Sequence, residues 1–314
     1  MKVKILFFCF PRHPFNQRSE DYFKIALVKN PNVDVRFVHE GGDVREIITR
    51  LDFSPDFIYI HDLEQFLLKR GNITGLSEVK IPKGLLFNDL HRNGHILQEF
   101  VEQNHINLIF AHYRDAFSRF FPNYKDQFRW LPYAVNLSIF KNYHKRKTIN
   151  YLLMGATNPR FYPLRHKIYK CMKNKEGFIY HAHPGYRDFS KKQEDKLFVE
   201  NRYAKEINRA KIFFTDDLIY HYPVKKFFEV VACNTLLLAS GSQELKDLGF
   251  VDGETYVEIN QENFEKKAKY YLKHKEERKQ IANNGYKMVR ARHSIDRRSQ
   301  EFVDMITEYL GGLK

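Results

Sequence analysis

Short apolar runs alternate with amphipathic segments along the first half of the chain. The amphipathic segments repeat their apolar residues every three or four positions, which is the spacing of a helix. Strands that alternate with helices of this length predict a parallel sheet covered on both faces. The predicted strands are 3–9, 33–38, 56–61, 84–88, 107–111 and 128–131, and the predicted helices are 19–28, 43–51, 63–69, 94–103 and 114–120.

The same alternation restarts after the basic run 144–147, which we interpret as a linker. The predicted strands are 150–155, 177–181, 210–215, 235–239 and 255–259; the predicted helices are 162–173, 199–208, 223–233, 262–273 and 275–292; and 183–195 is a predicted loop. We therefore expect an α/β protein with two Rossmann-like, doubly wound domains that face a cleft, residues 1–143 and 148–295. The segment 296–314 is expected to pack back on the first domain, because its apolar residues line one helix face.

The bulk composition indicates a globular protein. Of the 314 residues, 43% are hydrophobic and 15% aromatic, and no apolar run approaches the roughly 18–20 residues of a membrane span. The apolar start of the chain lacks a small-residue cleavage site, so a first strand is a better interpretation than a signal peptide. The three cysteines lie far apart in apolar segments, which is typical of buried thiols in a reducing compartment. We expect a cytoplasmic protein.

The formal net charge of +14 points to an anionic partner. Residues 262–298 hold 12 Lys and Arg against 5 Asp and Glu, a net charge of +7. This predicted helical stretch is either a solvated surface or a surface that docks on an anionic polymer or on the periphery of a membrane.

The segment 211–244 combines a strand, a loop, a helix and a second strand. Pro223 suits the first turn of the helix. Lys225 and Lys226 also fall in that turn, where the helix dipole disfavours cations unless an anion lies nearby. Asn234 is expected as a left-handed cap at the end of the helix. Glu229 lies among apolar residues and needs solvent, a partner or a ligand, because burial of a lone carboxylate is costly.

The sequence from Lys226 to Ser240, KFFEVVACNTLLLAS, resembles the signature of group 1 (family 4-like) glycosyltransferases. The branch it most resembles includes the spore maturation protein CgeB. A Leu-Pro-x-x-Val-Asn-x-x-x-Phe element at 131–140 matches the same family in its place just before the second domain. The resemblance implies the GT-B architecture, with Glu229 holding the ribose of a donor nucleotide and Lys226 facing its diphosphate.

A second group of donor-site candidates follows the first strand of the second half. Gly155 is a lone glycine, and the absence of G-x-G-x-x-G counts against a nicotinamide or flavin site. Arg165, in the first turn of its helix, is either a surface arginine or a bidentate phosphate clamp. The resembling branch shares the Gly and Tyr-x-x-Arg arrangement, which implies that Gly155, Tyr162 and Arg165 bind the donor.

Histidines at predicted strand ends are the catalytic candidates of the first half. Asp89 and His91 are two apart, so they can share a proton as a general base or bind the acceptor. His61 and His112 end the neighbouring strands, and each is either a polar loop residue or a catalyst. His13 lies in the loop that often carries the base of inverting enzymes with this architecture. We take Asp89 and His91 as the catalytic pair, and His13 and His61 as acceptor-side candidates.

No metal or cofactor is expected beyond a nucleotide sugar as co-substrate. Asp216 and Asp217 have the wrong spacing for an Asp-x-Asp metal motif, and His181 and His183 lack a third ligand. Many members of the family have two glutamates eight positions apart, whereas His221 stands eight positions before Glu229.

The sequence thus favours a metal-independent, hexosyltransferase-like enzyme. It would move a sugar from a nucleoside diphosphate to a protein or an anionic polymer such as DNA or a membrane-surface glycan. Two alternatives stay open: a nucleic-acid-binding or DNA-glycosylating protein, and a non-catalytic structural homologue of the GT-B fold. The nucleic-acid alternative lacks a recognisable reader motif.

Overall fold

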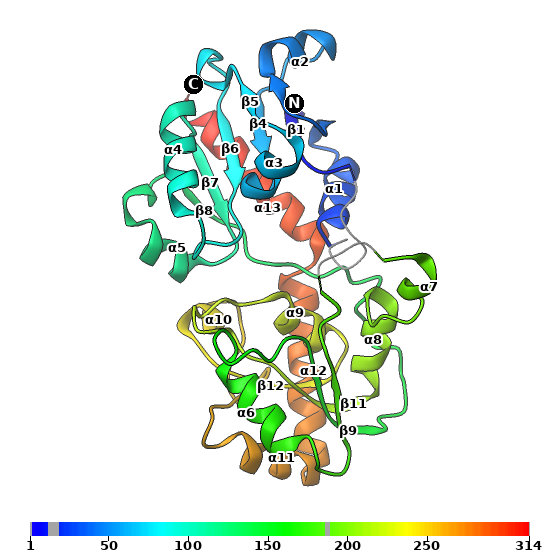
Figure 1. Cartoon of the computed structure of the whole chain (residues 1–314). Helices are drawn as coiled ribbons and strands as arrows, with labels where there is room; N and C mark the ends of the chain where they lie inside the picture. Colours follow the sequence, from blue (N-terminus) through cyan, green and yellow to red (C-terminus); the bar gives the residue numbers. More distant parts are fainter. Residues whose placement is uncertain (1, 12–18, 186–188, 314) are drawn as a thin grey trace. The chain divides into compact units, whose positions relative to one another are not determined.

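The computed structural model describes residues 2–11, 19–185 and 189–313. The chain divides into two compact units (Figure 1). Unit 1 takes in the described parts of Met1–His13, Glu20–Pro132 and Asp296–Lys314, and unit 2 consists mainly of Tyr133–Ile295. Within the described ranges, no helix is long and apolar enough to cross a membrane.

Unit 1 is built on a parallel sheet whose strand order is β2-β1-β4-β6-β7-β8. Its strands are β1 (Val3–Phe8), β2 (Val33–Val38), β4 (Phe57–Ile60), β6 (Lys83–Leu86), β7 (Leu108–Ala111) and β8 (Phe128–Trp130). Its helices are α1 (Ser19–Lys29), α2 (Val44–Arg50), α3 (Leu63–Arg70), α4 (Gly94–Asn104), α5 (Arg114–Phe120) and α13 (Ile295–Gly311). The short strands β3 (Gly42–Asp43) and β5 (Ile73–Thr74) form a separate parallel pair that the sequence pattern did not predict.

Aromatic side chains fill both faces of this sheet. On one face Phe302 of α13 contacts Tyr59 and Phe110, with ring centroids 4.7 and 5.0 Å apart. Phe23 of α1 meets the same Phe302 ring at 5.4 Å. On the other face Phe8 packs edge-on against a phenylalanine of α3. Because successive strand residues point to opposite faces, the continuous apolar run of β1 serves both layers.

Unit 2 contains a second parallel sheet with the strand order β10-β9-β11-β12-β13. Its strands are β9 (Ile149–Met154), β10 (Phe178–His181), β11 (Ala210–Phe214), β12 (Leu236–Ala239) and β13 (Val257–Glu258). Its helices are α6 (Pro163–Met172), α7 (Lys191–Glu194), α8 (Glu200–Arg209), α9 (Lys225–Ala232), α10 (Gln243–Asp247), α11 (Phe264–Lys273) and α12 (Lys275–Arg292). Two parallel sheets flanked by helices confirm the predicted α/β class with Rossmann-like units.

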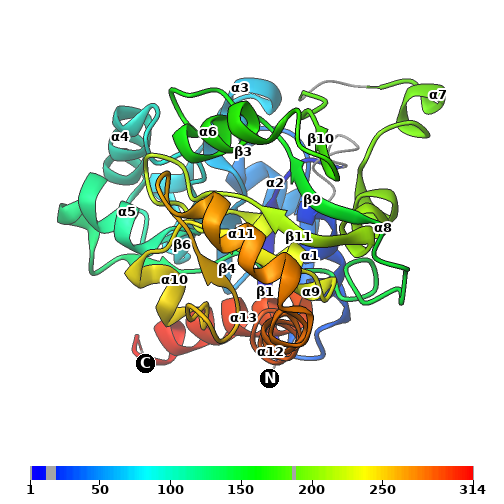
Figure 2. The ribbon, with the colours of Figure 1, turned by 90° about the horizontal axis from the view of Figure 1, so that it is seen from below.

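Helices cover both faces of the unit 2 sheet, as can be followed in Figure 2. The core on one face joins alternate residues of β9 and β11, such as Leu153 and Phe214, to Ile168 of α6 and Phe264 of α11. α8 contacts β11, and α9 contacts β12 and α12. The buried residues of α9 therefore anchor it, and its amino-terminal end follows the carboxyl end of β11.

The start of α9 differs from the prediction. The helix begins at Lys225 with Val224 as its N-cap, so Pro223 precedes the cap and lies outside the first turn. A proline fixes φ but leaves the following residues free, and here the chain stays extended at Val224 before the helix starts. Lys225 and Lys226 do occupy the first turn, and Asn234 has the predicted left-handed backbone, with φ of +52°.

Candidate functional site

Loops at the carboxyl ends of β9 and β11 bring Gly155 and Lys226 together. Gly155 follows β9 and has a φ of +118°, a backbone conformation that favours glycine. A Cβ atom built on it would lie 3.1 Å from Cε and 3.2 Å from Nζ of Lys226. The ammonium group of Lys226 therefore lies directly over the main chain that follows β9.

Arg165 is held in place by Asp216. Its Nε lies 2.8 Å from Oδ1 of Asp216, and its Nη2 donates to the main-chain oxygen of the same residue at 3.0 Å. The main-chain nitrogen of Arg165 donates to Oδ2. The Nη1 atom lies toward the loop after β9, 3.7 Å from the Cβ position of Gly155. Asp216 occupies the Nε edge of the guanidinium, so Nη1 is the guanidinium nitrogen that lies toward Gly155, and the bidentate phosphate clamp stays a prediction.

The ring of Tyr162 also contacts the arginine. It is the N-cap residue of α6, and the centre of the Arg165 guanidinium lies 4.2 Å from its ring centroid. This distance is typical of a cation–π contact. Gly155, Tyr162 and Arg165, which the sequence proposed as one group, thus form a cluster within unit 2 with Lys226, which came from a different stretch.

Lys226 and Glu229 lie one turn apart on α9, and both are half-buried. Neither side chain has a hydrogen bond or an ion pair with any described residue of the chain. Burial, and then Arg165, lower the pKa of Lys226 to about 8. Burial raises the pKa of Glu229, against the opposing effect of Lys226 and Lys225. Burial of a cation and a carboxylate without partners destabilises the folded protein unless a ligand binds to both groups.

His183, in the loop after β10, faces the same cations. Burial, followed by Lys226 and Arg165, lowers its pKa to about 4, so the imidazole is neutral near pH 7. Its Nδ1 accepts a hydrogen bond of 3.0 Å from the main-chain nitrogen of Gly185. The cluster therefore has two fixed positive charges and one neutral donor-acceptor ring, a composition that suits an anion.

Asp216 and Asp217 have structural partners that the sequence did not predict. Both are 2% exposed. Asp217 accepts a 2.6 Å hydrogen bond from Oγ of Ser240, and its Oδ2 lies 3.0 Å from Nδ1 of His221. The sequence showed only an acidic pair at the end of a strand. It could not indicate the partners of these two carboxylates, because the partners belong to other elements. In the described ranges, no group of three or more His, Cys, Asp or Glu is arranged to hold a metal ion.

In unit 1, Asp89 and His91 lie in the loop after β6. Asp89 is exposed, and its Oδ2 lies 3.8 Å from Nη1 of Arg92. His91 is half-buried, and burial lowers its pKa even though Asp89 opposes the shift. A lowered pKa favours the neutral form of the imidazole, which is the form that can accept a proton.

The other histidine candidates have different surroundings. His61 is 2% exposed; its Nε2 lies 3.2 Å from Glu20 of α1, and its ring stacks on Phe23. It is thus a core residue at the end of β4, and Glu20 was not foreseen as its partner. His112 is also buried, and its Nδ1 donates to the main-chain oxygen of Leu131 at 2.6 Å. His13 lies outside the described residues.

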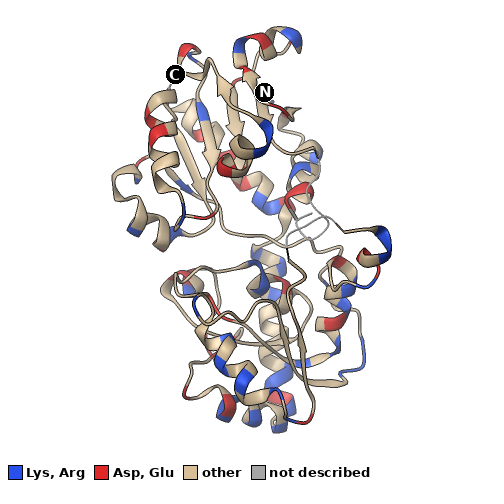
Figure 3. Cartoon of the chain, viewed as in Figure 1, with Lys and Arg blue, Asp and Glu red and all other residues tan. Residues whose placement is uncertain are grey.

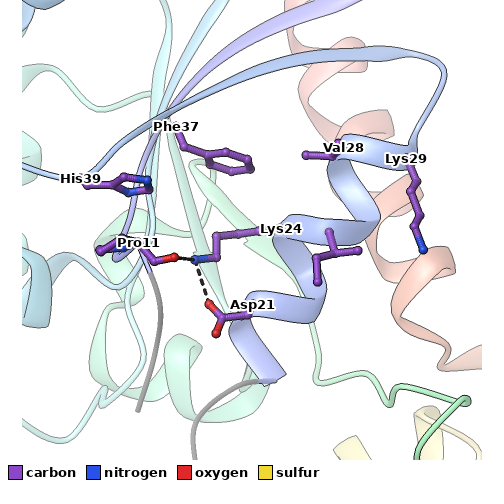
Figure 4. Close-up of a pocket in the computed structure, with 8 residues that line it drawn as sticks. Pro11, Asp21, Lys24, Val28, Lys29, Phe37 and His39 are labelled. Atoms are coloured by element: carbon purple, nitrogen blue, oxygen red, sulfur yellow. Dashed lines mark hydrogen bonds and ion pairs between the residues drawn. The ribbon is translucent and has the colours of Figure 1, made fainter. Parts of the chain in front are cut away.

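A pocket of about 400 Å³ lies elsewhere in unit 1, between α1 and the edge of the sheet at β2 (Figure 4). Lys24 reaches into it, but its ammonium donates to the main-chain oxygens of Phe10 and Pro11 and pairs with Asp21 at 2.8 Å. The remaining wall is mostly apolar, and none of the predicted site residues that the structure describes lines it.

Basic residues are spread over both units, and many lie on α11 and α12 (Figure 3). Several already form ion pairs within their own helix, such as Lys269 with Glu265 and Lys279 with Glu276. Exposed pairs of this kind contribute little to stability.

Comparison with known proteins gives one family match and many similar folds. Residues 165–304, somewhat less than half of the chain, match the family described as "Glycosyl transferase-like". No curated protein sequence matches the chain.

Three of the similar structures cover nearly the whole chain. Sucrose-phosphate synthase from Thermosynechococcus elongatus superposes with a TM-score of 0.68 at 11% identity, over 99% of this chain and 100% of the other. HepE from Anabaena, solved with UDP-glucose, superposes with a TM-score of 0.67 at 13% identity, over 99% of this chain and 100% of the other. A glycosyltransferase from Rickettsia africae superposes with a TM-score of 0.59 at 10% identity, over 98% of this chain and 99% of the other.

At such low identity these likenesses establish the fold. The chain has the GT-B fold, and the part of it that carries Arg165, Lys226 and Glu229 matches a glycosyl transferase-like family.

Proposed function

We propose that the protein is a glycosyltransferase that uses a nucleoside diphosphate sugar as donor. The observation that carries the proposal is the pair Lys226 and Glu229, recessed on one face of α9 and without a partner among the described residues. A nucleoside diphosphate supplies what each lacks, because its phosphates are anions and its ribose carries hydroxyl donors.

The diphosphate would bind at the start of α9. The first helical N–H groups have no side-chain cap there, and the helix dipole adds a partial positive charge. Lys226 and Nη1 of Arg165, which both lie near the Cβ position of Gly155, would contribute two further cationic contacts. The missing side chain at Gly155 would let the phosphates approach the main chain closely.

The ribose would lie one turn further along α9, at Glu229. Three residues of α-helix correspond to about 4.5 Å along the helix axis, so the two side chains offer separate contacts to the phosphates and to the ribose. An ionised carboxylate can accept hydrogen bonds from both ribose hydroxyls. Hydrogen bonds from the ribose hydroxyls would lower the pKa of Glu229 and so oppose the effect of burial, which raises it.

In the transfer step, the acceptor oxygen forms a bond to the anomeric carbon while the bond from that carbon to the phosphate oxygen breaks. The electron pair of the broken bond stays on the nucleoside diphosphate, where the cations and the helix N–H groups would stabilise it. This arrangement would make a metal ion unnecessary. We propose His91, adjacent to Asp89, as the group that accepts the acceptor's proton.

The resemblance to the CgeB branch and an anionic acceptor remain parts of this proposal. The net charge of +14 supports an acceptor such as a polyanion or the surface of a membrane.

The test is a thermal-shift panel with UDP, GDP, ADP, CMP and NAD. A ligand that binds only the folded state adds about 2.7 kcal/mol at a hundredfold excess over its dissociation constant. We expect a shift with one nucleoside diphosphate and none with NAD, and loss of that shift in Lys226→Ala and Glu229→Ala. Lys279→Ala, on the exposed face of α12, is the control.

Wild-type affinity in both site variants would refute the site. A salt-sensitive shift with DNA and none with any nucleotide would favour the nucleic-acid alternative. Nucleotide-sugar binding without turnover on any acceptor would favour a non-catalytic homologue.

A further inference from the structure

Tyr203 of α8 carries a buried hydroxyl group close to Glu229. The side chain as a whole is half-buried, whereas its hydroxyl oxygen is buried. That oxygen has no hydrogen-bond partner anywhere in residues 2–11, 19–185 and 189–313. Buried hydroxyl groups in proteins are nearly always hydrogen-bonded, so this one calls for an explanation.

The hydroxyl group faces the side of α9 that carries Glu229. α8 packs against α9. Burial raises the pKa of Tyr203 well above its ordinary value of 10; the carboxylate of Glu229 and the thiol of Cys233 add to this shift, and Arg165 opposes it. Glu229 and Cys233 are four residues apart, so they lie on one face of α9. A hydroxyl group that both of them affect therefore lies against that face.

The ring of Tyr203 is fixed, whereas the side chain of Glu229 can adapt. The ring meets the buried ring of Phe140 edge-on, with the two centroids 5.9 Å apart. A tyrosine has only two rotatable side-chain bonds, while the longer glutamate side chain has more rotamer freedom. Rotation of the Glu229 side chain can therefore bring a carboxylate oxygen to the fixed hydroxyl group.

The carboxylate of Glu229 can accept hydrogen bonds from the protein and from a ligand at the same time. It is half-buried, so a ligand can reach it, whereas the buried hydroxyl oxygen of Tyr203 is out of a ligand's reach. An ionised carboxylate has two acceptor oxygens, each with more than one lone pair. One oxygen can accept from Tyr203 while the other accepts from a ribose hydroxyl.

We propose that Tyr203 is a positioning residue, whose hydroxyl donates a hydrogen bond to the carboxylate of Glu229 when the ribose of the donor binds and so fixes the orientation of that carboxylate. This inference rests on the proposed function. The free protein holds a buried hydroxyl without a partner, and the bound protein satisfies it. Removal of the hydroxyl should therefore stabilise the free protein and weaken nucleotide binding.

The experiment compares the dissociation constants of UDP and 2′,3′-dideoxy-UDP by calorimetry, or of the GDP pair if the thermal panel selects GDP. In Tyr203→Phe we expect the dissociation constant of UDP to rise about tenfold, because a hydrogen bond to a charged group is lost. The dideoxy nucleotide lacks the hydroxyls that would contact Glu229, so its dissociation constant should stay near the wild-type value.

Tyr143→Phe is the matched control. It also removes a tyrosine hydroxyl of unit 2, but one that donates to the main-chain oxygen of Ile139, and it should leave both dissociation constants unchanged. Thermal unfolding without ligand is the second readout. We expect Tyr203→Phe to unfold at a higher temperature than the wild type although it binds UDP more weakly, a combination that a purely structural role would not produce.

Wild-type affinity for UDP in Tyr203→Phe, or an equal loss of affinity for both nucleotides, would overturn the role of Tyr203 and leave the proposed function intact. Failure of the wild-type protein to bind any nucleoside diphosphate would overturn both.

Discussion

The Nε atom of Arg165 lies 2.8 Å from Oδ1 of Asp216, and each side chain is 3% exposed. Asp216 follows β11 and Arg165 lies in the first turn of α6, so this ion pair joins two elements that are 51 residues apart in the sequence. The pair fixes the guanidinium and leaves its Nη1 near Gly155.

Removal of Asp216 should therefore destabilise the protein. In Asp216→Ala the guanidinium of Arg165 is left buried without its counter-charge, and we expect a loss of about 3–5 kcal/mol in the free energy of unfolding. Chemical denaturation at pH 7 measures it. Glu276→Ala, which removes an exposed partner of Lys279, is expected to cost less than about 1 kcal/mol. Equal effects of the two variants would contradict a structural role for the ion pair.

Gly155→Ala should reduce both stability and nucleotide binding. The left-handed φ of +118° costs alanine about 1–2 kcal/mol, and the new methyl group displaces the Lys226 side chain that lies 3.1 Å away. Gly253→Ala separates the two effects, since Gly253 has a φ of +74° but no heavy atom within 4 Å of its Cβ position. We expect Gly253→Ala to bind nucleotide like the wild type, as measured by calorimetry. Equal binding by both variants would argue against a ligand at Gly155.

The affinity for nucleoside diphosphate should fall as the pH rises through about 8. Burial and Arg165 lower the pKa of Lys226 to about 8 from its ordinary 10.5, so the free protein has a neutral Lys226 above this pH. Binding of the anion must then take up a proton, and the dissociation constant rises by up to about tenfold per pH unit. Lys226→Arg should remove this dependence, because arginine stays protonated. A wild-type affinity that is constant between pH 7 and 9.5 would contradict the prediction.

Tyr203→Phe should stabilise the ligand-free protein. The hydroxyl of Tyr203, on α8, is buried and has no hydrogen-bond partner among the described residues. A buried polar group without a partner costs about 1–3 kcal/mol, so its removal should raise the free energy of unfolding by roughly 1 kcal/mol. The control is Tyr143→Phe, which removes a hydroxyl that donates to Ile139 at 2.8 Å and should be destabilising. A decrease in stability for Tyr203→Phe, measured by urea denaturation, would show that the hydroxyl has a partner in solution.

The sequence by itself determined the elements and the class of fold. Every strand predicted in either half is present, because each is a short apolar run between polar segments and such runs are buried whatever their neighbours are. The left-handed Asn234 was also predictable, since a helix end followed directly by a strand leaves few other conformations. The short strands β3 and β5 and the helices α7 and α10 had too few residues to produce a periodic pattern.

The sequence also named the candidate donor-site residues, although it could not say how their side chains are held. Nothing near Arg165 in the chain indicates that Asp216 occupies the Nε edge of its guanidinium. In the same way, no local pattern joins His221 to Asp217 and Ser240, or places His61 against Glu20. These contacts unite side chains from different strands and helices, and the order in which strands pair decides which of them meet. Periodicity in the sequence identifies the buried face of an element. Only the tertiary structure determines which charged side chains of different elements contact one another there.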